Sequence, residues 1–510
     1  MLRRFTHNLS FTSFAILALG SLIALALSAL IVYAHPLAPF GIVIGIVAML
    51  VVLSRIELAL YALIAVAVLL PFGALPLNVG FNPTFLDLAL LAVTGLWLLQ
   101  TLTRQTGEFI ATPLALLIVT FMTLAVFSFV FGLGHAPLTA QVARQFVEIQ
   151  ISIALFFVVV NTIRTRAQLE RVIQVLILAG FASALIGIFL YIIPRALSVQ
   201  LLSLLRVFKY PAGPKVLRFI EDDPANSMRA ISTSVDPNVL GGLLILVLAL
   251  TIPQLAAPRR LFARNQVIAM VAVMFICLLL TFSRGALLAV TAAILLLLFA
   301  GLSKRTDPFT AALIVFLGAP LIALAGFSLL YFLPWTNPYA AHLLAGLQGQ
   351  DRATLMRFGE YKDALELISR YPFFGVGFSG SPDIDTYIGV SSVYLLMAEE
   401  MGLIGLGAFL LIMLTFFARA FAAWFAWARR DAFIAPILSG LVAALFGALI
   451  AGFIDHYFFN LKFPHSVALF WLYAALAMAA LRLQDSSPTS YKLAMGVGDS
   501  STKDAKKHKG

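Results

Sequence analysis

The longest polar stretch in an otherwise apolar chain runs from Asp351 to Gly405 and reads DRATLMRFGEYKDALELISRYPFFGVGFSG, followed by SPDIDTYIGVSSVYLLMAEEMGLIG. Its first part repeats apolar side chains at helical spacing with charged ones between them, which predicts an amphipathic helix over 351–370. Pro372 ends this helix, because the residue before a proline avoids the helical conformation. Glycines that predict a loop able to approach a ligand closely follow at Gly375, Gly377 and Gly380.

The composition around this stretch predicts an all-α polytopic membrane protein. Hydrophobic residues make up 62% of the 510 positions, far above the share in a soluble domain. We expect about fourteen transmembrane helices, each long enough to cross the hydrocarbon layer. Their expected limits are 10–33, 37–53, 56–72, 83–100, 112–133, 141–162, 168–193, 238–256, 265–283, 285–302, 309–333, 391–418, 433–454 and 464–483. The first apolar stretch is too long for a cleaved signal, so we expect a retained signal anchor.

The distribution of charge predicts the orientation. The net charge is +11, and most Lys and Arg residues fall in short loops on one side of the expected spans. The short loops on the other side, near 34–36, 73–82 and 134–140, contain neither residue. This positive-inside pattern predicts a multi-pass protein of the cytoplasmic (inner) membrane with both termini cytoplasmic. Because the basic residues are accounted for in this way, we expect no nucleic-acid partner.

The same spans divide the chain into six expected parts. They are the N-terminal transmembrane helices (1–193), a first long extracytoplasmic loop (194–237), the central transmembrane helices (238–333), a second long extracytoplasmic loop (334–390), the C-terminal transmembrane helices (391–484) and a disordered basic cytoplasmic tail (485–510). Both long loops carry several Lys and Arg residues. Each of these basic residues alone fits a solvated surface loop. Together they suit an anionic lipid-linked ligand, because an arginine can donate two hydrogen bonds to one phosphate.

Two arginines beside apolar spans stand out, Arg229 near the end of the first long loop and Arg284 between two central spans. Arg229 precedes Asp236-Pro237-Asn238, which is also a good helix start with Asp236 as the N-cap and Pro237 in the first turn. Arg284 lies between two apolar spans with almost no loop. A charge there is costly unless it snorkels to the membrane surface or meets an anion. Snorkelling and phosphate binding at a helix end both remain open for Arg284.

These residues resemble the O-antigen ligase and polymerase superfamily. The loop pattern that carries the resemblance is Arg357, Tyr361, Ala364-Leu365, Pro372, Gly375-Val376-Gly377, Tyr394-Leu395, Glu400 and Gly402-Leu403-Ile404-Gly405, after Arg229 and Arg284. The resemblance covers roughly 225–480. It implies a metal-independent glycosyltransferase without a cofactor, acting in cell-surface polysaccharide assembly. Such enzymes move a glycan from an undecaprenyl diphosphate carrier to an acceptor sugar hydroxyl outside the cytoplasmic membrane.

The resemblance also implies partners and roles. The partners are a lipid-linked glycan donor, a saccharide or lipid acceptor, and membrane lipids. Arg229 and Arg284 are expected to hold the diphosphate. The further residues expected at the substrates are Asp236, Asn238, Arg357, Tyr361, Ser391, Ser392 and Tyr394.

The chain departs from the family pattern at the base that takes the acceptor's proton. The family's His-Asn pair is replaced by Ser391-Ser392, and serine is no base at neutral pH. A carboxylate on the following helix, Glu399 or Glu400, is one replacement, and His456 on another loop is a second. Glu400 is alternatively an ion-pair partner of Arg284 or Arg229, and His456 alternatively a solvated loop side chain.

Two other functions stay open. The protein could bind the carrier without catalysis, as the missing histidine suggests. It could also be a transporter or flippase for a lipid-linked glycan, which predicts charges at mid-membrane depth and broken helices in matching halves. The unusual charges of this sequence fall at the expected outer boundary, which favours the enzyme.

Overall fold

The computed structural model describes residues 49–485, apart from 79, 106, 136, 304, 333–340, 342–343, 347, 350, 379–388 and 428–430. The expected span at 10–33, most of the span at 37–53 and the tail after Asp485 lie outside these residues. The chain divides into two compact units, Met1–Ala59 and Leu60–Gly510. Of the first unit only residues 49–59 are described.

Nearly all regular structure in the described residues is helical. The α-helices are α3 (Ile56–Leu69), α4 (Phe85–Leu102), α5 (Ala115–Gly132), α6 (Ala140–Thr162), α7 (Arg166–Ile192), α8 (Arg195–Leu204), α9 (Pro237–Thr251), α10 (Arg264–Leu280), α11 (Arg284–Leu302), α12 (Pro308–Phe332), α14 (Arg352–Arg370), α15 (Val393–Trp427), α16 (Ile434–Ala451) and α17 (Pro464–Asp485). Short 3₁₀ turns are η1 (Leu205–Phe208), η2 (Pro214–Val216), η3 (Ile220–Asp222) and η4 (Ile252–Leu255). A two-stranded antiparallel sheet joins β1 (Arg218–Phe219) to β2 (Met228–Arg229), with Arg218 opposite Arg229.

The helices confirm the all-α polytopic class. Within the described residues, nine helices are long and apolar enough to cross a membrane, and three further apolar helices, Ile56–Leu69, Arg264–Leu280 and Pro308–Leu321, are shorter. Each of them coincides with a span expected from the sequence. The total of about fourteen remains a prediction, because the first two expected spans lie mostly outside the described residues.

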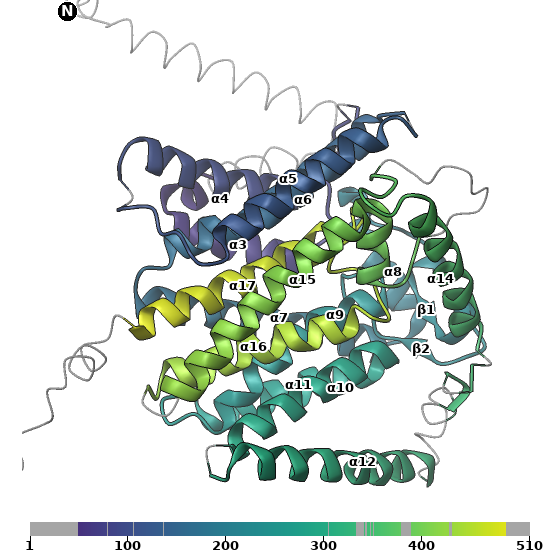
Figure 1. Ribbon diagram of the computed structural model, residues 1–510. Helices are drawn as coiled ribbons and strands as arrows, with labels where there is room; N and C mark the ends of the chain where they lie inside the picture. The colour runs from purple at the N-terminus through teal and green to yellow at the C-terminus, as the bar shows by residue number, and fades with distance from the viewer. Residues whose placement is uncertain are drawn as a thin grey trace, which may run out of the picture. The chain divides into compact units, whose positions relative to one another are not determined.

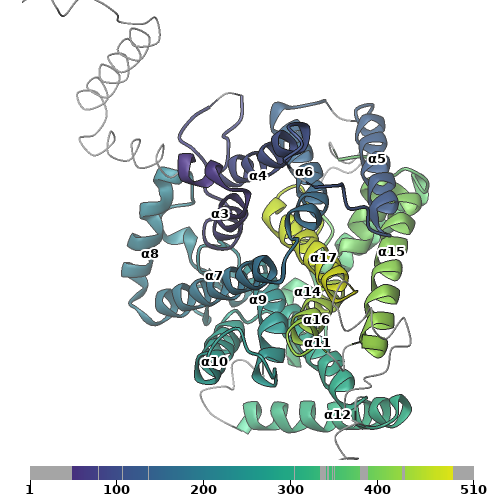
Figure 2. The same ribbon diagram turned by 90° about the vertical axis from the view of Figure 1, so that its left-hand side faces the viewer.

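Helix α17 forms the centre of the packing. Figures 1 and 2 show it flanked by α6 and α16, and the most extensive helix contacts are those of α17 with α6 and of α16 with α11 and α9. Trp471 and Tyr473 of α17 are almost wholly buried. By contrast α5 and α15 expose large apolar side chains such as Leu116 and Leu414, as helices in contact with lipid do.

The amphipathic helix expected over 351–370 is confirmed as α14. Asp351 is its N-cap, and its side chain accepts a hydrogen bond from the Thr354 N–H. Ala364 and Leu367 are buried, whereas Leu355, Phe358 and Leu365 are exposed. The other long loop, expected over 194–237, is more ordered than a solvated loop, since it contains α8, the 3₁₀ turns and the β1–β2 hairpin.

Helix α15 is longer than the expected span and is broken at Gly402, which has φ 69° and ψ 179°. A break of this kind leaves backbone groups without helical partners, which is costly in apolar surroundings. The segment between α14 and α15 supplies partners: the N–H groups of Val376 and Gly377 donate to the carbonyls of Glu399 and Glu400 at 2.8 and 3.0 Å. The break in α15 is therefore stabilised by backbone hydrogen bonds from the segment between α14 and α15.

The glycines of that segment serve this contact. Gly375 and Gly377 have φ of 69° and 82°, in the left-handed region that favours glycine. A Cβ on Gly375 would overlap the Glu399 carbonyl, and a Cβ on Gly377 would overlap the backbone of Gly132 in α5. The prediction that these two glycines approach a ligand is wrong, because they approach the protein's own helices. Gly380 lies outside the described residues.

Candidate functional site

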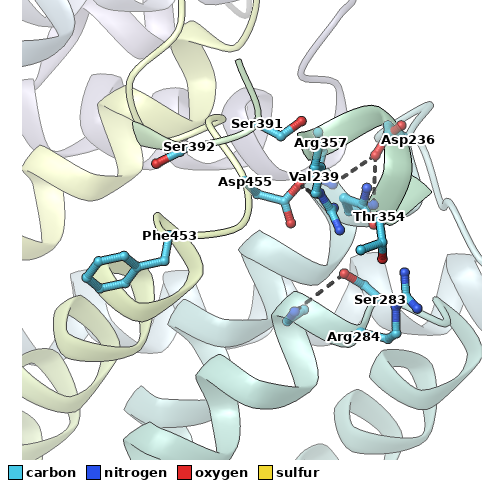
Figure 3. Close-up of polar contacts among 12 residues, drawn as sticks. Asp236, Val239, Ser283, Arg284, Thr354, Arg357, Ser391, Ser392, Phe453 and Asp455 are labelled. Atoms are coloured by element: carbon cyan, nitrogen blue, oxygen red, sulfur yellow. Dashed lines mark hydrogen bonds and ion pairs between the residues drawn. The ribbon is translucent and has the colours of Figure 1, made fainter. Parts of the chain in front are cut away.

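Three helices, α9, α11 and α14, begin at one partly open pocket with a cavity volume of about 70 Å³. Its polar lining consists of Glu221, Arg229, Asn238, Ser283, Arg284, Asp351 and Arg357. The first turn of a helix presents backbone N–H groups and a partial positive charge, both of which favour anions. Four residues chosen from the sequence, three arginines and one asparagine from distant parts of the chain, thus line the same pocket. Figure 3 labels three of these lining residues, Ser283, Arg284 and Arg357.

Arg229, at the end of β2, is held by two hydrogen bonds. Its Nε donates to the Thr281 carbonyl at 2.8 Å, and Nη2 donates to Asn238 Oδ1 at 2.8 Å. A guanidinium has five N–H donors, so these two bonds fix its plane and leave Nη1 without a hydrogen-bond partner among the described residues. Burial lowers the pKa of Arg229, while the nearby carboxylates of Asp236 and Asp455 oppose that shift.

Arg284, the first residue of α11, is held by a carboxylate at the start of α14. Its Nη2 lies 2.6 Å from Asp351 Oδ2, and the two side chains are 18% and 1% exposed. Burial alone would raise the pKa of Asp351, but hydrogen bonds from Arg284 and Thr354 lower it to about 2. Gly346 packs directly on the guanidinium, where any Cβ would overlap it. Arg284 is therefore fixed in position.

Arg357 projects from the second turn of α14. Its Nη2 lies 3.6 Å from Asp455 Oδ1, and Asp455 belongs to the turn between α16 and α17 (Figure 3). Each of the three arginines thus has a polar partner from a different element. A buried pair of this kind costs desolvation, and its best-supported use is to fix geometry rather than to add stability.

The backbone is strained immediately before two of the three helices. Val235 has φ 61° and Phe282 has φ 52°, and they precede the N-caps Asp236 and Ser283. A β-branched residue at positive φ is a true outlier, and such strain concentrates at functional sites. Asp236 accepts hydrogen bonds from the N–H groups of Asn238 and Val239, so the N-cap expected from the sequence is confirmed.

The remaining substrate residues expected from the sequence lie on the neighbouring helix contacts. The Tyr361 hydroxyl lies 3.1 Å from the Ser391 carbonyl and 3.0 Å from the Phe453 carbonyl. The Ser392 hydroxyl donates to the carbonyl of Gly452, just after α16, at 3.2 Å. The Tyr394 hydroxyl donates to the carbonyl of Leu449, within α16, at 2.8 Å. These hydroxyls tie α14 and α15 to the end of α16. None of them lines the pocket.

Two of the candidate bases expected from the sequence, Glu400 and His456, have different surroundings. Glu400 lies just before the break in α15, and its buried Oε2 has no hydrogen-bond partner within the described residues. Arg284 is paired with Asp351 and Arg229 is hydrogen-bonded to Asn238, and among the described residues no ion pair joins Glu400 to either arginine. His456 is partly buried beside the Phe463 ring, and burial lowers its pKa to about 4.

Two acidic residues of the site were not chosen from the sequence. The position of Asp351 before an amphipathic helix is typical of an N-cap, so that role could be predicted from the sequence. Its ion pair with Arg284 depends on the tertiary contact between the starts of α14 and α11, which the sequence does not display. Asp455 precedes His456 in the chain. Nothing in its local sequence indicates an approach to Arg357, which is 98 positions away.

The fold defines the chain as a polytopic membrane protein, and three arginines line its pocket. Residues 269–410 match the family model described as O-antigen ligase, which confirms the resemblance to the O-antigen ligase and polymerase superfamily. The match is shorter than the stretch expected from the sequence. It contains Arg284, Asp351 and Arg357 but neither Arg229 nor Asp455. A search of curated proteins gave no match.

Proposed function

We propose that this protein transfers a glycan from an undecaprenyl diphosphate carrier to a sugar hydroxyl on the outer face of the cytoplasmic membrane. The observation that carries the proposal is that Arg229, Arg284 and Arg357 line one pocket, and that three helices begin at this pocket. When the glycan leaves its carrier, the diphosphate gathers negative charge. Fixed guanidinium groups stabilise that charge without having to reorganise.

The carboxylates of the site support the same function. Asp351 and Asp455 sit beside two arginines and, with Glu221, offset part of the positive charge. An anion carrying two phosphates meets guanidinium groups whose planes are already set, so less side-chain entropy is lost on binding. This arrangement favours a ligand that binds and is then released over permanent retention of an anion.

The test is to delete the protein and measure lipid-linked glycan in the membrane. We expect the carrier-linked glycan to accumulate on the outer face, and the wild-type protein to remove it when restored. If the glycan accumulates on the cytoplasmic face instead, the protein is a flippase. If its amount is unchanged, the transfer function is wrong.

The orientation can be tested separately with single cysteines. We expect a cysteine at Gly349 to react with an impermeant reagent from outside, and one at Lys304 to react only after permeabilisation. This follows from the positive-inside pattern of the short loops. The native Cys277 is buried, so its background labelling is small. The reverse labelling pattern would place the arginine pocket on the cytoplasmic side.

A further inference from the structure

The proposed transfer leaves one chemical need unmet. An acceptor hydroxyl must lose its proton as its oxygen attacks the sugar, and Ser391 and Ser392 cannot take that proton. We propose that Asp455 is the general base for the acceptor hydroxyl. This inference rests on the proposed function and gives it a residue that neither the family match nor the sequence pattern indicates.

The position of Asp455 carries the proposal. Its Oδ2 lies 3.1 Å from the place where a Cβ on Gly285 would stand, and Gly285 lines the arginine pocket. Because residue 285 has no side chain, none of its atoms fills the space between that oxygen and the pocket. A larger residue there would separate the carboxylate from the ligand.

The two oxygens of the carboxylate have different surroundings. Oδ1 lies 3.6 Å from Arg357 Nη2, which orients the group (Figure 3). Oδ2 is buried and has no hydrogen-bond partner among the described residues. A buried polar atom without a partner is uncommon in proteins and costly to leave so. An acceptor hydroxyl that donates to Oδ2 would satisfy it.

The charges around Asp455 suit a base. Arg357 and Glu360 of α14 act on it, as do Arg229 and Asp236 from the segment before α9, and His456 and Tyr457 follow it in the chain. Burial raises the pKa of Asp455 to about 6, with Arg357 opposing the shift. A general base works best with a pKa near the operating pH, where it is ionised yet still basic.

Other groups nearby are less suitable. The Tyr361 hydroxyl lies against two backbone carbonyls, and burial raises its pKa. His456 has its pKa lowered to about 4, which makes it a weak base. Glu400 is at the break in α15, and no described residue of α15 lines the arginine pocket, whereas Asp455 Oδ2 lies beside Gly285 of that lining.

The step balances as follows. The acceptor O–H bond breaks and its proton moves to Asp455 Oδ2, while the acceptor oxygen forms a bond to the anomeric carbon. The bond from that carbon to the diphosphate oxygen breaks, and its electron pair leaves on undecaprenyl diphosphate. Asp455 then releases its proton to water, and no oxidant, reductant or metal takes part.

The test compares Asp455→Asn with the wild-type protein by two measurements, undecaprenyl diphosphate binding and glycan transfer to the acceptor. We expect transfer to fall by about 100-fold or more, the usual range for loss of a general base, with binding unchanged. Asp363→Asn on α14, whose carboxylate lies away from the pocket lining, is the matched control and should transfer normally. Unchanged transfer in Asp455→Asn would overturn the assignment, whereas a wild-type protein that binds the carrier without transfer would overturn the proposed function itself.

A pH profile separates a base from a residue that only holds Arg357. In the wild-type protein transfer should fall as the pH drops through about 6, because Asp455 becomes protonated there. The residual transfer of Asp455→Asn should lose this acidic limb, although Glu360 and Asp236 remain. Added formate should restore transfer in Asp455→Gly, since it supplies a carboxylate. An acidic limb that persists in Asp455→Asn, or no rescue by formate, would show that Asp455 only positions Arg357.

If Asp455→Asn does not fold, Asp455→Glu decides the question. The longer side chain keeps a carboxylate but changes its surroundings, so we expect reduced transfer with a shifted acidic limb. An acidic limb at the wild-type position would contradict the base assignment.

Discussion

Arg229→Lys should lower glycan transfer by about 100-fold or more while the protein remains folded. The guanidinium uses Nε on the Thr281 carbonyl and Nη2 on Asn238, and Nη1 remains for a ligand. A lysine ammonium carries the same charge, but it cannot hold both of these partners in one plane and still present a further donor to a diphosphate. The measurement is transfer by the purified variant, together with its binding of undecaprenyl diphosphate.

The matched control for this variant is Arg206→Lys. Arg206 belongs to the same segment between α7 and α9, is exposed and does not line the pocket. We expect its transfer to equal that of the wild-type protein. Full transfer by Arg229→Lys would mean that this arginine serves only as a charge near the membrane surface.

The second large effect is expected on stability. Gly402→Ala should destabilise the protein by at least about 2 kcal/mol, because alanine is strained at positive φ and its Cβ would overlap backbone atoms. Gly402 has φ 69°, and the Phe373 carbonyl occupies the place of its Cβ. Beside it, the Leu403 N–H donates to the Pro372 carbonyl at 2.7 Å. Thermal unfolding in detergent should show a clearly lower Tm.

Gly407→Ala, later in the same helix, is the control for Gly402→Ala. A Cβ on Gly407 meets nothing within 4 Å, so alanine there should leave the Tm unchanged or raise it slightly through its better helix propensity. If the two variants unfold at the same temperature, the break in α15 does not hold the segment after α14. The transfer activity of folded Gly402→Ala would then also be expected to stay normal.

The helices themselves could be predicted from the sequence. The lengths of the apolar stretches predict the transmembrane helices that are described, and the spacing of Phe358, Tyr361 and Leu365 predicts α14. The N-cap at Asp236 followed from local chemistry alone. These features depend on neighbouring residues, which a sequence displays directly.

The contacts between distant segments could not be predicted in the same way. The pairs Arg284–Asp351 and Arg357–Asp455 join residues far apart in the chain, and only the return of α14 towards α11 and the α16–α17 turn brings them together. The glycines at 375 and 377 predict a loop whose backbone can approach another group closely, but the sequence does not show which group that is. In the structure the loop approaches α15. No pattern of apolar residues in the sequence indicates the break of that helix at Gly402.

The most direct test of the proposed transfer uses membranes from cells that lack the protein, in which we expect lipid-linked glycan to accumulate. Purified wild-type protein is added together with acceptor, and free undecaprenyl diphosphate is measured alongside glycan joined to the acceptor. The transfer mechanism predicts that both products appear in equal amounts, and that Arg229→Lys forms neither at a comparable rate. Glycan that remains on its carrier in the presence of folded wild-type protein and acceptor, with no diphosphate released, would contradict it.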